Sequence, residues 1–125
     1  MRKFMMIAAA ALLLASPALA QHKHGDHKGP NGGPVEDVAG VHAEFVASGA
    51  SLTFNILNED NKPLSAKGYT GSVLIVSGSE RETVQLTATD TALKGEAKKA
   101  VPAGAAVTLQ LKTDAGKSGQ ARFKK

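Results

Sequence analysis

The fold is decided by residues 41–56, VHAEFVASGASLTFNI, in which apolar and polar side chains alternate on both sides of a glycine. Val41, Ala43 and Phe45 alternate with polar neighbours, and the pattern repeats from Leu52 to Ile56. A period of two is typical of a strand with one face against a core. The stretch therefore predicts two β-strands.

Strand-like runs recur along the rest of the chain. They cover residues 73–76, 83–88, 93–96, 107–112 and 119–123, and turn-forming stretches such as 58–63 separate them. Short runs at a spacing of about ten residues are typical of a β-sandwich or barrel. We therefore expect residues 35–125 to form an all-β domain, an antiparallel immunoglobulin-like sandwich of about seven strands with no substantial helix.

The first 20 residues have the composition of a secretory signal peptide. Arg2 and Lys3 precede an uncharged apolar run of 12 residues, and residues 18–20, ALA, match a signal-peptidase site. A bilayer span needs about 20 apolar residues, so the run is too short for a membrane anchor. We expect export to the periplasm or the cell exterior, with cleavage after Ala20 and no membrane insertion.

Composition excludes several classes of function. The chain has no cysteine, so packing alone must stabilise a single domain. Its formal net charge is +4, but the lysines are scattered and aromatic residues are few, which argues against a nucleic-acid partner. The sequence contains no motif typical of a catalytic nucleophile, of a zinc protease or of a phosphate-binding loop. We therefore expect a protein that is not an enzyme.

All four histidines lie between positions 22 and 42, and three of them, with one aspartate, form a short tract. The tract belongs to residues 21–34, a segment without aliphatic side chains that we expect to be a flexible tail. Imidazole and carboxylate groups suit Zn²⁺, Cu²⁺ or Ni²⁺, and all three methionines lie in the signal peptide. The tract predicts a weak, exchangeable metal site, and a solvated tail without a role is the alternative. Its candidate ligands are His22, His24, Asp26 and His27.

His42 and Glu44 form a second candidate. Side chains two residues apart on a strand point to the same face, so this pair lies opposite Ala43 and Phe45. They could be the fixed half of a metal site that the tail completes. The alternative is that the outward face of a strand is simply polar, and the spacing leaves both interpretations open.

Three motifs carry a resemblance to a known family. Residues 29–35 (GPNGGPV), 41–46 (VHAEFV) and 58–64 (NEDNKPL) resemble small exported β-domains of Gram-negative bacteria. The same module is similar to a periplasmic domain in the adaptor subunits of heavy-metal efflux pumps, and the similarity continues through residues 101–104 and 119–123. The resemblance implies that His42 and Glu44 are functional beside Gly32 and Gly33. It also places Asn31 where a histidine usually precedes the glycine pair.

Two functions follow from these observations. The first is a soluble periplasmic protein that binds or buffers divalent transition metal ions and assists an efflux component. The second is a non-catalytic protein-interaction or structural module that docks a partner at an exposed strand edge, with an incidental histidine tract. The candidate metal ligands of the first are His22, His24, Asp26, His27, His42 and Glu44.

Overall fold

The computed structural model describes residues 28–125, and eight β-strands in them form one antiparallel sheet. The all-β prediction is confirmed: the described part of the chain contains no helix. Nor does it contain a helical segment of the length and apolar character that a membrane span requires. The strands are β1 (Val35–Val38), β2 (Val41–Ser48), β3 (Ser51–Leu57), β4 (Thr70–Ser77), β5 (Glu80–Ala88), β6 (Ala92–Glu96), β7 (Ala106–Lys112) and β8 (Ser118–Lys124).

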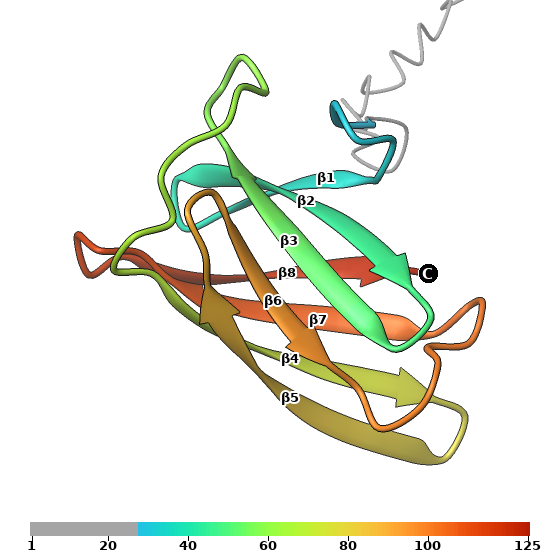
Figure 1. The fold of residues 1–125 in the computed structure, drawn as a ribbon. Helices are drawn as coiled ribbons and strands as arrows, with labels where there is room; N and C mark the ends of the chain where they lie inside the picture. Colours follow the sequence, from blue (N-terminus) through green and yellow to red (C-terminus); the bar gives the residue numbers. More distant parts are fainter. Residues whose placement is uncertain (1–27) are drawn as a thin grey trace, which may run out of the picture.

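The sheet bends back on itself and is nearly closed into a barrel (Figure 1). Its strand order is β1-β2-β3-β6-β5-β4-β7-β8. The bend lies between β5 and β6, which pair only at Thr87 with Lys94 and Ala88 with Leu93. The two end strands of this order, β1 and β8, lie side by side without a hydrogen-bonded ladder. The expected sandwich of two separate sheets is therefore not confirmed.

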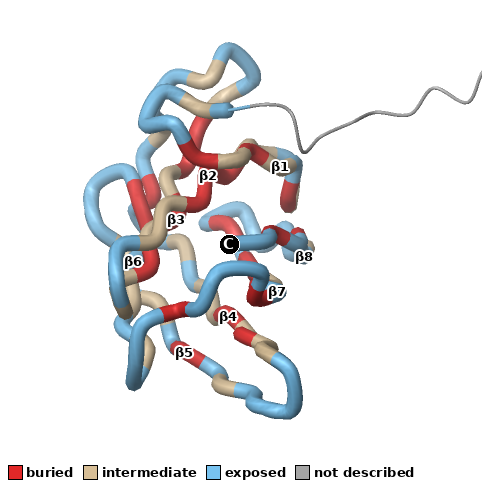
Figure 2. The backbone as a smooth tube through the Cα atoms, turned by 90° about the vertical axis from the view of Figure 1, so that its right-hand side faces the viewer, coloured by how far each residue is buried: buried red, intermediate tan, exposed pale blue. Residues whose placement is uncertain are grey.

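The core fills the space between the two halves of the bent sheet, where the buried segments of Figure 2 face one another. Phe45 of β2 and Phe54 of β3 stack with ring centroids 5.1 Å apart. Phe123 of β8, from the opposite half, lies 5.5 Å from Phe45 and 5.6 Å from Phe54. These aromatic contacts join the two halves, and they occupy the positions that the period-two pattern assigns to the buried face.

The structure has one strand more than the seven expected, because β1 is short and its turn is hard to recognise. Its four residues are too few for a clear alternation. The chain returns to β2 through Ala39 and Gly40, with φ angles of 52° and 85°. Such a two-residue turn usually carries Asn-Gly or Asp-Gly, and alanine rarely adopts positive φ.

The aromatic cluster gives a first prediction. Phe54 is fully buried, so we expect Phe54→Ala to lower the free energy of unfolding by about 3–5 kcal/mol. Urea denaturation followed by circular dichroism measures the change. Glu59→Ala, on an exposed loop, is the control and should stay within about 0.5 kcal/mol of the original chain. Equal stability of the two variants would contradict this account of the core.

Candidate functional site

The two site residues predicted on β2 lie on its outer face, as the alternation requires. Ala43 and Phe45 are buried in the core, whereas His42 and Glu44 point the other way. The tract residues His22, His24, Asp26 and His27 lie outside the described residues. Within residues 28–125, no group of three or more histidine, aspartate and glutamate side chains could hold a metal ion. A metal site that uses His42 would therefore need ligands from outside the described residues.

Glu44 is fully buried although it lies on the outer face of the sheet. One carboxylate oxygen, Oε2, accepts hydrogen bonds from the backbone N–H of Asn31 at 2.8 Å and of Gly33 at 3.0 Å. The other, Oε1, accepts from the side-chain amides of Asn31 at 2.9 Å and Asn55 at 3.4 Å. Successive N–H groups of a turn form a concave site for an anion. Here the anion is the protein's own carboxylate.

The covering segment, residues 28–34, is a tight turn rather than part of a flexible tail. Gly32 N–H donates to the carbonyl of Gly29 at 2.9 Å, and Gly29 N–H donates to the carbonyl of Gly33 at 2.7 Å. Pro30 stands at the second position of the inner turn, where its fixed φ is favourable. The turn joins the sheet at its end, because Phe45 N–H donates to the carbonyl of Pro34 at 3.0 Å.

Glycine is required at two positions for the turn to lie this close to β2. A Cβ atom on Gly33 would lie 2.1 Å from the backbone oxygen of Phe45. A Cβ on Gly29 would lie 2.6 Å from Cδ of Glu44. Both glycines are therefore needed because any side chain would push the turn off the carboxylate.

His42 is the accessible member of the pair. Its Nε2 lies 2.8 Å from Oδ1 of Asp37 on β1, and its Nδ1 lies 3.0 Å from Oδ1 of Asn61. The side chain of His42 is 26% exposed and that of Asp37 is 69% exposed. Asn61 belongs to a loop held by Asn58, whose side-chain oxygen accepts hydrogen bonds from two backbone N–H groups. An imidazole thus stands between two oxygen atoms at the surface.

The 2.8 Å between His42 Nε2 and Asp37 Oδ1 is the distance of a hydrogen-bonded pair, shorter than the distance between two ligands of one metal ion. Tetrahedral Zn²⁺ with ligands at about 2.1 Å separates two ligand atoms by about 3.4 Å. The 2.8 Å between His42 Nε2 and Asp37 Oδ1 would have to widen by about half an ångström, and the exposed Asp37 side chain can move by that amount. A His–Asp pair supplies two ligands and leaves the others to come from elsewhere.

The anchored turn contacts Glu44, which is close to His42 along the same strand. Gly29 lies against Glu44, which is two residues from His42 on the same face, a spacing of about 7 Å along a strand. The predicted ligands at positions 22–27 directly precede Lys28 in the sequence. The tract is therefore joined in sequence to a turn that contacts Glu44.

Sequence reasoning missed four residues of this site, and two of them follow from strand register. Asp37 pairs with His42, and Asn55 pairs with Glu44, so a correct pairing of β1, β2 and β3 would have placed them. Asn31 stands at the position where the resemblance expects a histidine, and its contact with Glu44 gives it a structural role. Asn61 reaches His42 from a loop 19 residues away, and no local pattern marks it.

No protein-family model matches the chain, and the comparisons with curated proteins and with solved structures likewise give no match. The resemblance to efflux-adaptor domains therefore stays a prediction. Any function must be argued from the geometry of the chain itself.

Glu44 provides the second prediction. In Glu44→Gln, an amide N–H₂ replaces one acceptor oxygen and faces N–H donors, so we expect a loss of about 2 kcal/mol in the free energy of unfolding. We also expect faster hydrogen exchange at the amides of Asn31 and Gly33, whose acceptor changes from a charged carboxylate to a weaker, uncharged amide. Chemical denaturation and exchange measured by NMR test both effects.

Glu36→Gln is the matched control, because Glu36 is a carboxylate on the neighbouring strand β1 that is only partly buried. It should change stability by less than about 0.5 kcal/mol. Similar losses in the two variants, or unchanged exchange at Asn31 and Gly33, would show that Glu44 does not hold the turn.

Proposed function

We propose that this is a non-catalytic, exported periplasmic protein that binds or buffers divalent transition metal ions, Zn²⁺, Cu²⁺ or Ni²⁺, and assists metal efflux. The observation that carries the proposal is the accessible imidazole of His42, set between Asp37 and Asn61. His42 is two residues from Glu44, which the anchored turn contacts, and the histidine tract precedes this turn in the sequence.

The proposed ligand set combines fixed and tethered groups. His42 and Asp37 are the fixed ligands, and His22, His24, Asp26 and His27 supply the others. Nitrogen and oxygen ligands of this kind suit borderline divalent ions, for which imidazole is a common ligand. A short tether gives an effective concentration of about millimolar, so two weak half-sites can hold one ion more tightly than either does alone.

In this proposal Glu44 acts through position rather than as a ligand. Both of its oxygens already accept hydrogen bonds from Asn31, Gly33 and Asn55. Ligation would require breaking these bonds and exposing a buried group, which costs stability. We assign Glu44 to fixing the turn and therefore the point where the histidine tract leaves the domain.

A protein-interaction module is the second candidate, and one observation favours it. In the sheet order, β1 and β8 are the end strands and form no ladder with each other. Edges without a hydrogen-bonded partner can accept a strand from another protein, which here would have to enter between β1 and β8. In that case the histidine tract has no role, and the metal titration below decides between the two candidates.

Metal binding is tested by calorimetric titration of the exported chain, from residue 21, with Zn²⁺, Cu²⁺ and Ni²⁺. We expect His42→Ala and a deletion of residues 22–27 each to weaken binding by about tenfold or more, because each removes one of two linked half-sites. Asp37→Asn should weaken binding as well, since an amide oxygen is a poorer ligand than a carboxylate.

Asp60→Asn, the same change on an exposed neighbouring loop, is the control and should leave the affinity unchanged. If the deletion of residues 22–27 reduces the affinity but His42→Ala and Asp37→Asn do not, the tract binds metal by itself and the proposed strand site is wrong. If no ion binds more tightly than about millimolar, the affinity expected of a single weak half-site, the metal proposal fails and the interaction module is favoured.

The pH dependence of binding gives a further prediction. Protons and metal ions compete for the same imidazole nitrogen, and histidine titrates near pH 6.5 in peptides. Lowering the pH from 7.5 to 5.5 should therefore weaken binding by about tenfold for each coordinating imidazole. Calorimetry at the two pH values measures this, and an affinity that does not change with pH would rule out histidine ligands.

A further inference from the structure

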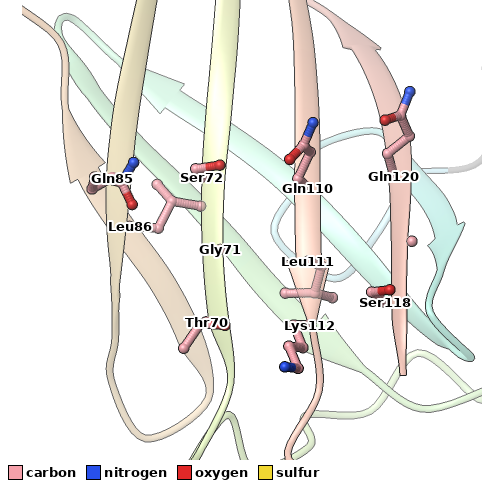
Figure 3. A pocket seen from close by; sticks show the side chains of 11 residues that line it. Thr70, Gly71, Ser72, Gln85, Leu86, Gln110, Leu111, Lys112, Ser118 and Gln120 are labelled. Atoms are coloured by element: carbon pink, nitrogen blue, oxygen red, sulfur yellow. The ribbon is translucent and has the colours of Figure 1, made fainter. Parts of the chain in front are cut away.

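The outer face of strands β5, β4, β7 and β8 carries a row of amide and hydroxyl side chains. Ser72 pairs with Gln85 on one side and Gln110 on the other, and Gln110 pairs with Gln120. These four side chains stand on neighbouring strands in Figure 3. With strands about 4.8 Å apart, the row spans about 14 Å across the sheet.

The row borders a hollow of about 690 Å³. Thr70 and Ser72 of β4 have short side chains and form its floor, and the longer Gln85 and Gln110 rise from the strands on either side. A second row, in which Lys112 pairs with Thr70 and with Ser118, closes one end. The hollow is therefore lined by groups that both donate and accept hydrogen bonds, by one cation, and by the apolar side chains of Leu86 and Leu111.

The outward positions of these four strands carry positive charge and no carboxylate. The two glutamates of β5 turn toward the loop that follows β6 instead: Glu80 pairs with Lys99 at 2.8 Å, and Glu82 accepts a hydrogen bond from Lys98 N–H at 2.9 Å. The outward positions are the alternates of buried residues such as Val73, Val84 and Leu109. The outward cations are Arg81, Lys112, Arg122 and Lys124.

We propose that this face binds an acidic polysaccharide, with sugar hydroxyls on the glutamine row and sugar carboxylates near Lys112 and Arg122. Amides and hydroxyls match sugar hydroxyls because each can donate and accept. The outward cations, which form no salt bridge with another described residue, match an anionic chain. A nucleic acid fits less well, because no outward position of these strands has an aromatic side chain on which a base could stack.

The test is an NMR titration of the ¹⁵N-labelled exported chain with oligogalacturonate, with neutral dextran and with dextran sulfate. Oligogalacturonate should shift the amide signals of β4, β5, β7 and β8 around Ser72 and Gln110. Lys112→Glu/Arg122→Glu should weaken its binding by about tenfold. Gln85→Ala/Gln110→Ala, which leaves the charge unchanged, should weaken it by about fivefold.

Lys62→Glu/Lys98→Glu is the matched control, because it reverses the same number of charges on two exposed loops and should change the affinity by less than about twofold. Equal losses in this control, or no loss in the glutamine variant, would reduce the binding to general charge attraction and overturn the proposal. Equal binding of dextran would overturn the requirement for an acidic ligand. Tighter binding of dextran sulfate would show that the face prefers sulfate groups and would overturn the assignment to sugar carboxylates. Shifts confined to other strands, or no binding, would also overturn it. The dispersion of the amide signals shows that each variant is folded.

Discussion

The site depends on a buried carboxylate that has only N–H groups to balance its charge. Burying an ionised side chain costs several kcal/mol unless hydrogen bonds compensate it. Glu44 meets this requirement with four donors, three of them from residues 31 and 33 of one turn. The dependence is mutual, because the turn shields the carboxylate from water and the carboxylate holds the turn against the sheet. Glycine at positions 29 and 33 follows from this close approach rather than from any requirement of the strands themselves.

The strand that carries Glu44 links this constraint to the stability of the domain. The inner side of β2 contributes Phe45 to the aromatic cluster that joins the two halves of the sheet. Its outer side presents His42 and Glu44, and its neighbours β1 and β3 add Asp37 and Asn55 by register. The side chains of the site are thus held by a strand that is paired on both edges and packed on one face. In the proposed metal site, the His42 side chain on this strand would lose little conformational entropy on binding.

Patterns within one stretch of the sequence predicted which face of a strand is buried. They missed the contacts that a strand makes with a neighbouring strand, turn or loop. The alternation around Phe45 and Phe54 identified the buried face because a period of two is visible in the sequence itself. The same alternation correctly turned Glu44 away from the core, but it could not show that a turn covers the outer face there. Asp37 was not predicted because its register depends on the hairpin turn at Ala39. Alanine rarely adopts the positive φ of this turn, so the sequence does not indicate it. The contact between Asn61 and His42 joins a loop to a strand, and only the folded chain brings them together.

The two proposed sites lie on opposite halves of the bent sheet and differ in charge. The outer face of β1 and β2 offers Asp37 and His42, which suit a cation, whereas the outer face of β4, β5, β7 and β8 offers cations and amides without a carboxylate. Packed β-layers are about 10 Å apart, and the Debye length at physiological ionic strength is about 8 Å. Charge on one face is therefore largely screened from the other. An ion bound beside His42 would leave the polar face free to hold an anionic chain, so one small domain could carry both activities at once. Coupling between them would require a change in the core that joins Phe45 to Phe123, and tight packing opposes such a change.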